Sequence, residues 1–219
     1  PVEEKISAII TYGKKAEGNL VMVTKNGIIK KTPLKDYGNV RRTGIIALKL
    51  RKGDLLKWVK LSSGKDDVII ITSQGQAIRF KETQARPMGR AASGVRAIRL
   101  KGSDHVASMD IIPGDKSAEK HLKLLVVMAN GFGKQTPLSQ YKVQGRGGSG
   151  IKTAKITSKT GTLVAAHLID TQEEILAISA KGQIIRTKLA QVRTASRATQ
   201  GVKIMTLNAK DSVAGVICL

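Results

Sequence analysis

The chain is poor in cysteine and in aromatic residues, and it contains no long apolar run. Its single cysteine, Cys218, excludes an intramolecular disulfide framework and a zinc site built from several cysteines. Aromatic residues make up 3% of the chain, so its core must be aliphatic. The same shortage argues against single-strand binding, which uses aromatic platforms for base stacking. No apolar run reaches the roughly 20 residues of a membrane-spanning helix.

Acidic residues are also scarce, and this shortage sets the charge of the protein. The 219 residues include 38 Lys and Arg against 16 Asp and Glu, which gives a formal net charge of +22. So large an excess in a small protein indicates a polyanionic partner. Nucleic acid is the first candidate. An anionic membrane is the second, but no basic amphipathic helix stands out to support it.

Motifs of catalysis are missing from the sequence. The three histidines, His105, His121 and His167, have no partner at the spacing of a known catalytic or metal-binding motif. There is no Gly-x-Ser-x-Gly, His-Glu-x-x-His or phosphate-binding loop. The acidic pairs at 66–67 and 173–174 lie between expected strands, where solvated charges are common. We therefore expect no catalytic site, metal or cofactor in this chain.

Glycine recurs in a regular pattern along the chain. Four apolar runs each end in a turn glycine, and a second glycine follows 17, 19, 19 and 19 residues later. Successive turn glycines are 48, 56 and 51 residues apart, a period typical of propeller-like or solenoid arrays. The turn glycines are Gly27, Gly75, Gly131 and Gly182, and the second glycines are Gly44, Gly94, Gly150 and Gly201.

Each repeat has the plan of a four-stranded blade. A continuous apolar strand leads through a tight turn such as Asn26-Gly27, a strong hairpin signal, into a second strand. A basic loop follows, then a third strand that starts at the second glycine, and a fourth. We predict an all-β fold with little helix, in one domain whose blades span about 20–66, 67–122, 123–173 and 174–219. Residues 1–12, with a strand at Lys5–Thr11, are expected to close a preceding blade.

Basic residues recur at fixed places in this repeat. An arginine stands four positions before the second glycine, and further cations stand two and five positions after it and near the end of the second strand. Such columns, with few compensating acids, favour a positive track for a phosphate backbone over ordinarily solvated charges. In these four groups the predicted DNA-binding cations are Arg90, Arg146 and Arg197, with Arg41 and Arg42 in the shorter first repeat; Arg96, Lys152 and Lys203; Lys49, Arg99 and Lys155; and Lys30, Lys31, Arg79, Lys134 and Arg186.

The richest of these loops is Gln144–Gly150, with four glycines and an arginine in seven residues. Glycine lets a backbone approach another group closely, which suits a phosphate backbone. We therefore add Gln144, Gly147 and Gly148 to the predicted contacts. One point complicates the track. Positions two and five after the glycine face opposite sides of a regular strand, so a bulge must intervene or only one column reaches the rim.

These contacts favour duplex DNA bound with little sequence preference. Phosphate contacts supply affinity and position but do not read bases, and no recognition helix is expected. Trp58 lies within an expected strand and is assigned to packing. A curved basic rim would bend the duplex, and bending 20–30 base pairs by 40–90° costs of the order of 1–6 kcal/mol. Many phosphate contacts could offset that cost.

Several motifs together resemble one family. Lys31-Thr-Pro-Leu34, Arg86-Pro-Met-Gly-Arg90 and Tyr141–Gly150 are similar to segments of the C-terminal domain of bacterial DNA gyrase A. The resemblance implies a β-pinwheel whose blades exchange strands and whose outer rim wraps duplex DNA. It also implies partners in the rest of gyrase A and in gyrase B, and a cytoplasmic, nucleoid-associated location. The ATP- and Mg-dependent strand passage that produces negative supercoils would lie elsewhere in that type IIA topoisomerase.

Two departures from the family pattern stand out. The family's signature box reads Gln-Arg-Arg-Gly-Gly-Lys-Gly in its first blade, whereas Gly145 and Ser149 replace an Arg and the Lys in this chain. The family has five or six blades, and we count four and a strand, as expected for a chain that begins part-way through the domain. The equivalent domain of topoisomerase IV, and a propeller serving as a protein-interaction platform, remain as alternatives.

Overall fold

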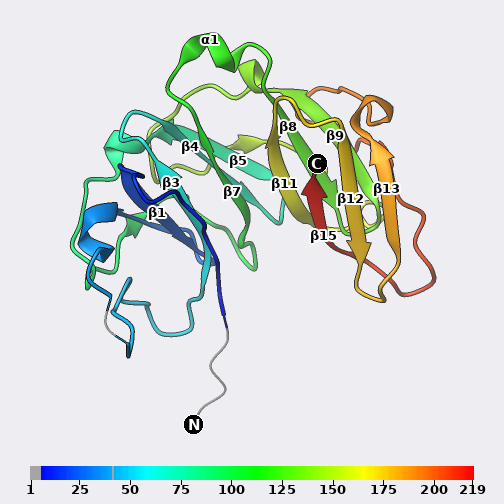
Figure 1. The fold of residues 1–219 in the computed structure, drawn as a ribbon. Coiled ribbons are helices and arrows are strands. Elements are labelled where there is room, and N and C mark those ends of the chain that lie inside the picture. Colours follow the sequence, from blue (N-terminus) through cyan, green and yellow to red (C-terminus); the bar gives the residue numbers. More distant parts are fainter. Residues whose placement is uncertain (1–5, 41) are drawn as a thin grey trace.

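Four antiparallel sheets stand side by side in an arc (Figure 1). The computed structural model describes residues 6–40 and 42–219, and all counts of strands and helices refer to that part of the chain. Three sheets have four strands and the last has three, in the orders β3-β1-β2-β6, β10-β5-β4-β7, β11-β8-β9-β14 and β13-β12-β15. The predicted all-β fold of propeller-like blades is confirmed.

Each repeat contributes a hairpin, a short third strand and a long fourth strand, except that the described part of the first repeat forms no third strand. The hairpins are β1 (Asn19–Thr24) with β2 (Ile28–Pro33), β4 (Asp67–Thr72) with β5 (Gln76–Lys81), β8 (Lys123–Met128) with β9 (Phe132–Pro137), and β12 (Glu174–Ser179) with β13 (Ile184–Lys188). The third strands are β6 (Val95–Arg96), β10 (Ile151–Lys152) and β14 (Val202–Lys203). The fourth are β3 (Leu56–Ser62), β7 (Val106–Ile112), β11 (Leu163–Ile169) and β15 (Val213–Cys218).

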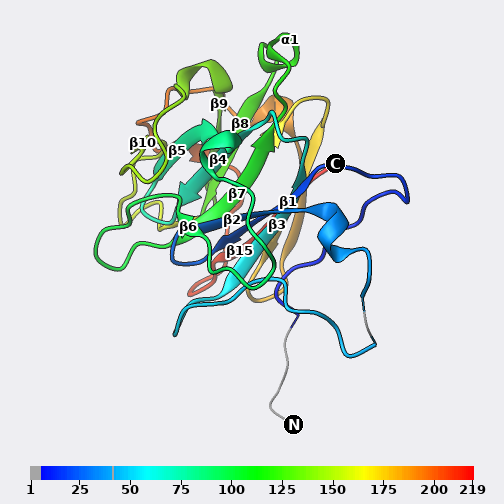
Figure 2. The same cartoon turned by 90° about the vertical axis from the view of Figure 1, so that its left-hand side faces the viewer.

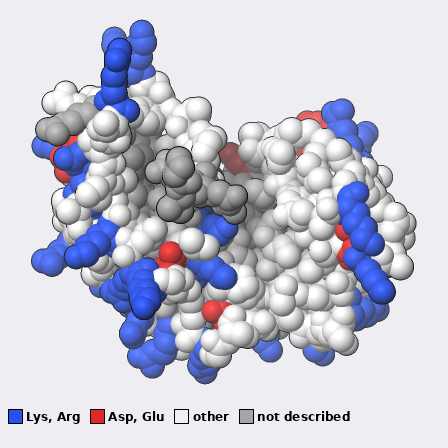
Figure 3. Space-filling model, turned by 90° about the horizontal axis from the view of Figure 1, so that it is seen from below, with Lys and Arg blue, Asp and Glu red and all other residues white. Residues whose placement is uncertain are grey.

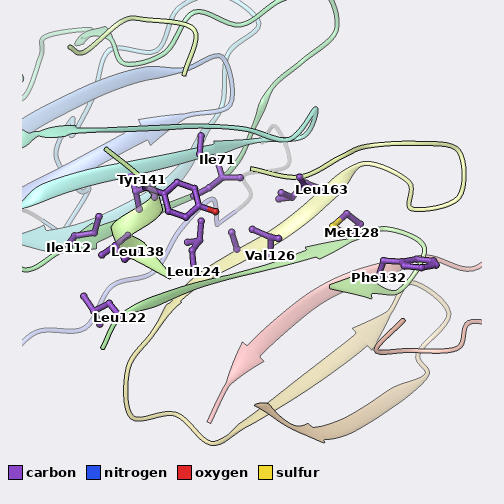
Figure 4. Packing of buried hydrophobic residues seen from close by; sticks show 14 residues of the cluster. Ile71, Ile112, Leu122, Leu124, Val126, Met128, Phe132, Leu138, Tyr141 and Leu163 are labelled. Atoms are coloured by element: carbon purple, nitrogen blue, oxygen red, sulfur yellow. The ribbon is translucent and has the colours of Figure 1, made fainter. Parts of the chain in front are cut away.

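In the first three hairpins the first strand is buried on both faces, and this joins neighbouring sheets, whereas in β12 every second residue is only partly buried. Alternate residues point to opposite faces of a strand. In β4, Ile70 therefore packs towards β1 while Ile69 and Ile71 pack towards β8. Figure 4 shows the second of these clusters, with Leu124 and Val126 grouped beside Ile71. Unbroken aliphatic runs are thus required, which is why so few aromatic residues suffice.

In the last three repeats, the third strand completes the sheet of the repeat before it. β6 pairs with β2 and β10 with β5 (Figure 2), and β14 pairs with β9, always antiparallel. All three pairs have the same register. The residue that follows the second glycine of one repeat lies opposite the residue two positions after the turn glycine of the repeat before it. Thus Val95 pairs with Ile29, and Ile151 with Ala77.

Close approach at this exchange explains the second glycine of the last three repeats. Gly94, Gly150 and Gly201 have φ of 84°, 73° and 75°, which favours glycine. A Cβ at Gly150 would lie 2.5 Å from the carbonyl oxygen of Ala77, and one at Gly201 would lie 2.4 Å from that of Gly133. A side chain at these positions would therefore push the exchanged strand away from its acceptor.

Two expected strands are absent from the described residues. Residues 6–12 form no strand, and neither do residues 43–50 of the first repeat. The predictions of a strand at Lys5–Thr11 and of a third strand in the first repeat are therefore wrong for the described residues. For residues 43–50 the described chain offers no acceptor, because the other three third strands each pair with the hairpin of a preceding repeat.

Helical structure is confined to short pieces. Each second strand runs into a 3-10 turn, namely Leu34–Tyr37, Glu82–Gln84, Leu138–Gln140 and Leu189–Gln191. The insertion after β7 contains the single α-helical turn of the described chain, α1 (Lys116–Glu119). None of these described helices is long and apolar enough to cross a bilayer. Trp58 packs partly buried against the cluster between the first two sheets, as predicted.

We predict that Gly150→Ala destabilises the protein more than Gly53→Ala. Both glycines have positive φ, of 73° and 76°, so each substitution incurs the left-handed penalty of about 1–2 kcal/mol. Gly53 has no described neighbour within 4 Å of an added Cβ, whereas at Gly150 the Ala77 carbonyl must move. That displacement should add about 1–3 kcal/mol. Urea unfolding followed by circular dichroism measures both, and equal losses would contradict the exchange geometry.

Candidate nucleic-acid interface

The exchanged strands lie on the outside of the arc. The fourth strands β3, β7, β11 and β15 stand at the opposite edge of their sheets and pack against one another in sequence along its inner side. Arg96, Lys152 and Lys203 each occupy the second residue of an exchanged strand, and all three are exposed. Figure 3 shows Lys and Arg side chains gathered around the periphery of the molecule, with few acidic ones among them.

The cations five positions after the second glycine also reach this surface. Arg99 and Lys155 are exposed, although the spacing placed them on the opposite side of a regular strand from Arg96 and Lys152. The ladder lasts only two residues, after which the chain leaves the sheet and strict alternation ends. The backbone N–H of Arg99 donates to the carbonyl of Gly148, 2.8 Å away, and Lys155 donates likewise to Thr199 at 3.0 Å. Both columns therefore lie beside the glycine loop of the next repeat.

The arginines four positions before the second glycine are half-buried. Arg146 donates from Nε to the carbonyl of Gln84, 2.9 Å away, and from its guanidinium to the carbonyl of Arg96. Arg197 donates to the carbonyl of Lys152 at 3.0 Å. A guanidinium carries five N–H donors, so these bonds fasten each loop to the exchanged strand of the repeat before it without using all of them. Arg90 is half-buried in the equivalent place.

Four predicted contacts are buried, and direct phosphate contact by them is excluded. Lys30, Lys31, Arg79 and Lys134 have exposed fractions of 0%, 4%, 6% and 0%. Lys31 forms an ion pair with Glu82 at 3.4 Å. Arg79 binds Asp67 and Glu119, with N–O distances of 2.7 and 2.6 Å. The loop of the next repeat covers this end of the second strand, a contact that the single-repeat pattern did not indicate. Arg186 is exposed but pairs with Glu174.

Two of these buried lysines hold the basic loops in place. Lys30 and Lys134 both stand three residues after a turn glycine. The Nζ of Lys134 donates to the carbonyls of Ser196 and Arg197, at 2.6 and 2.5 Å. The Nζ of Lys30 donates to the carbonyls of Ala47, at 2.6 Å, and Arg90. Burial lowers the pKa of each amine to about 8, and the adjacent Arg90 or Arg197 acts in the same direction. They are positioning residues for the loops that carry the arginines.

The backbone of the loop at Gln144–Gly150 is largely engaged by its neighbours. The N–H of Gln144 donates to the carbonyl of Arg79 at 2.7 Å, and that of Gly147 to Ala97 at 2.8 Å. Gly148 is exposed and uses its carbonyl for Arg99. The glycines therefore fit the loop against the sheet of the preceding repeat, where Arg146 is half-buried and bonded to the carbonyls of Gln84 and Arg96.

The first repeat offers a shorter basic segment. Arg42 and Lys49 are exposed, and Arg41 lies outside the described residues.

The outer cations have no acidic partners in the described chain. Among residues 6–40 and 42–219, no carboxylate forms an ion pair with any of the cations on the exchanged strands or the glycine loops. No cluster of three or more His, Cys, Asp or Glu able to hold a metal ion occurs among the described residues. The surface is thus an unpaired positive track, which consists of Arg90, Arg96, Arg99, Arg146, Lys152, Lys155, Arg197 and Lys203.

We predict that the unfolding free energy of the protein, relative to that of a Lys134→Met variant, rises between about pH 8 and the usual lysine range. Below the folded-state pKa of about 8, the amine is protonated in both states and contributes no pH dependence. Above it the unfolded chain binds more protons than the folded one, so stability rises with pH. Unfolding at a series of pH values measures this difference. Lys30→Met should show the same window, and a flat difference for both would contradict the burial effect.

Comparison with known proteins identifies this arrangement. The chain matches the family described as DNA gyrase C-terminal domain, beta-propeller, over residues 18–63, 66–113, 123–170 and 173–219. DNA gyrase A of Mycolicibacterium smegmatis is 39% identical over 217 residues, which are 98% of this chain and 25% of that protein. That of Deinococcus deserti is 38% identical over 214 residues, which are 96% of this chain and 26% of that protein. The chain spans about a quarter of the length of these relatives.

Solved structures share the fold. The structure of a DNA gyrase A C-terminal domain superposes with a TM-score of 0.81 at 24% identity, over 100% of this chain and 75% of that one. The C-terminal domain of a DNA topoisomerase IV superposes with a TM-score of 0.86 at 22% identity, over 95% of this chain and 64% of that one. Four family repeats coincide with the four sheets of the arc. The chain therefore belongs to the family of DNA gyrase C-terminal domains.

Proposed function

We propose that the chain acts as one domain that binds duplex DNA along its outer rim, with little sequence preference, and bends the DNA around the arc. The observation that carries this proposal is the recurrence of exposed, unpaired cations on the exchanged strands and beside the glycine loops. Duplex DNA presents about one phosphate charge per 1.7 Å of axis, so a track of this kind can follow it from repeat to repeat.

The curvature of the arc determines the path that bound DNA would follow. Because the exchanged strands stand at the outer edge of three successive sheets, DNA that contacts all three must follow the curve (Figure 1). Each further phosphate contact offsets part of the bending cost. In a gyrase holoenzyme, with the rest of gyrase A and with gyrase B, such a bend would present a DNA crossing to the strand-passage machinery and so support negative supercoiling.

We predict that Arg96→Gln combined with Lys152→Gln weakens DNA binding and lowers its salt dependence. Each lost phosphate contact reduces the slope of log K against log salt by about 0.9, so the pair should reduce it by about 2. The matched control is Lys57→Gln with Lys210→Gln, which removes the same charge from exposed sites on the inner strand β3 and before β15. Fluorescence anisotropy of a labelled duplex across salt concentrations measures both. Equal slopes in the two variants would place binding elsewhere.

Chiral wrapping has a separate test. Ligation of nicked circular DNA with increasing protein should shift the linking number with one consistent sign, and the shift should shrink in the Arg96→Gln, Lys152→Gln variant. Binding without a change in linking number would limit the function to DNA binding and bending. If the duplex does not bind even at low salt, DNA binding itself is contradicted. Binding that loses far less than about 10³ in affinity between 50 and 200 mM salt contradicts a track with 6–10 phosphate contacts and favours a protein-interaction platform.

A further inference from the structure

The cations of the exchanged strands lie near one end of the sheets. Each exchanged strand pairs only with the first two residues of a second strand, directly after the hairpin turn. Arg96, Lys152 and Lys203 stand opposite the first of these two residues, although β2, β5 and β9 each continue for 6 residues. The positive track is therefore displaced towards the end of the sheets that carries the hairpin turns.

A four-residue turn recurs at this end in every repeat, between the third-strand segment and the fourth strand. Each turn is closed by a hydrogen bond of 3.0–3.2 Å from its last N–H to its first carbonyl. These turns are residues 51–54, 101–104, 157–160 and 208–211. Together with the hairpin turns at 25–27, 73–75, 129–131 and 180–183 they form a surface that we call the turn face.

The turn face is rich in exposed lysine. It has seven exposed cations, and none of them forms an ion pair within the described chain. These cations are Lys25, Arg51, Lys52, Lys101, Lys159, Lys181 and Lys210. The feature that raised the charge of the rim, a cation at a recurrent place in the repeat, thus occurs on this face as well.

The few carboxylates of the turn face are bonded to its own backbone. Three of the four-residue turns end in an aspartate whose Oδ1 accepts from an N–H of a hairpin turn, and these turns contain no other acidic residue. Asp54 accepts from Asn26 at 3.0 Å, Asp104 from Gln74 at 3.0 Å, and Asp211 from Lys181 at 3.1 Å. The carboxylates therefore fasten the turns and leave the lysines without acidic partners.

The opposite end of the sheets, marked by α1 in Figure 1, has a mixed charge. Acidic residues lie there in the connections that lead to each hairpin and in or beside the 3-10 turns. They are Glu17, Asp36, Asp66, Asp67, Glu82, Asp115, Glu119, Asp170, Glu173 and Glu174. Lysines at that end stand among these carboxylates. A polyanion on the rim is therefore attracted towards the turn face and away from the end with α1.

One aromatic ring joins the rim to the turn face. The Nζ of Lys159 lies 5.5 Å from the ring centroid of Phe132, and that of Lys203 lies 6.0 Å from it. Both distances are within the range of a cation–π contact. Lys203 belongs to the exchanged strand β14, whereas Lys159 belongs to the turn at 157–160. The positive track of the rim thus continues onto the turn face at this sheet.

We propose that duplex DNA on the rim lies off-centre, towards the turn face, and that Lys101 and Lys159 contact its phosphates. The inference rests on the proposed function and adds a second row of contacts to it. Both lysines follow closely after cations of the track, Lys101 after Arg99 and Lys159 after Lys155. Lys210, next to Asp211 at the inner end of its turn, lies outside this row.

The two rows contact the duplex from different sides. The exchanged strands approach it from the rim, and the turns at 101–104 and 157–160 approach it from the turn face. Movement of the duplex towards the turn face is limited by the second row, and movement the other way brings its phosphates nearer to the acidic end. The path of the DNA along the arc is thereby fixed in height as well as in curvature.

A comparison of two variants with the same net charge tests the second row. Lys101→Gln with Lys159→Gln removes both proposed contacts, whereas Lys65→Gln with Lys120→Gln removes two exposed lysines from the opposite end. Fluorescence anisotropy of a labelled duplex across salt concentrations measures both. The slope of log K against log salt should fall by about 0.9 for each lysine of the first variant and stay near that of the parent in the second. An unchanged slope in the first variant, or an equal change in both, overturns the proposal.

The same measurement separates this inference from the proposed function. If Arg96→Gln with Lys152→Gln lowers the slope and Lys101→Gln with Lys159→Gln does not, the duplex binds the rim alone and only the off-centre path is wrong. A parent chain that does not bind the duplex even at low salt contradicts both.

Directed cleavage reads the position of the duplex. Ser158→Cys and Ser139→Cys, each combined with Cys218→Ser, place one exposed thiol at either end of β9, whose 6 residues span about 20 Å. An iron chelate attached to the thiol produces hydroxyl radicals that cut nearby DNA. The chelate at position 158 should cut the bound duplex more strongly than the chelate at position 139. Equal cleavage from the two positions, or stronger cleavage from position 139, overturns the off-centre path.

Discussion

Backbone pairing between one repeat and the sheet of the repeat before it is the contact on which this structure depends. A sheet edge exposes N–H and C=O groups that need partners, and in this arc the partner comes from a later repeat of the same chain. The close fit requires glycine at Gly94, Gly150 and Gly201, where a Cβ would lie 2.4–2.5 Å from a carbonyl oxygen. Each repeat is therefore incomplete alone, and the arc is stable as a row in which every sheet is finished by its neighbour.

The same pairing builds the basic rim. An exchanged strand is the outermost strand of its sheet, so a cation at its second residue faces outward without any further device. The loops beside it are fastened across repeats, with Arg146 bound to the carbonyl of Arg96 and Lys134 bound to the carbonyls of Ser196 and Arg197. Cations that would otherwise be mobile are thus held on a framework of backbone hydrogen bonds. On the proposed function, this ordering lowers the conformational entropy that the loops lose when they bind DNA.

The repeat, the hairpins and the outer columns could be predicted from the sequence because local signals carry them. Asn26-Gly27 indicates a turn by itself, and Arg96 and Lys152 recur at a fixed distance from a glycine. The roles of Lys30 and Lys134 could not be predicted, because a lysine in a strand looks the same whether it faces solvent or the carbonyls of a later repeat. The strand expected at residues 43–50 was wrong for the same reason. Their sequence is that of a strand, but strand formation depends on an acceptor that the described first repeat does not have.

The positive net charge of this protein opposes the packing interactions that stabilise its fold. A net charge of +22 disfavours any compact state through self-repulsion. The arc limits this cost by placing its unpaired cations at the outer edge, where water and salt screen them, while the cations nearer the core are bound by other groups of the protein. Arg79 and Lys31 have carboxylate partners. Lys30 and Lys134 donate to backbone carbonyls, and burial lowers the pKa of each amine to about 8. The repulsion that remains among the outer cations is located where a bound polyanion would reduce it. On the proposed function, therefore, binding DNA and stabilising the fold are the same electrostatic event, because a ligand that binds only the folded state raises its stability.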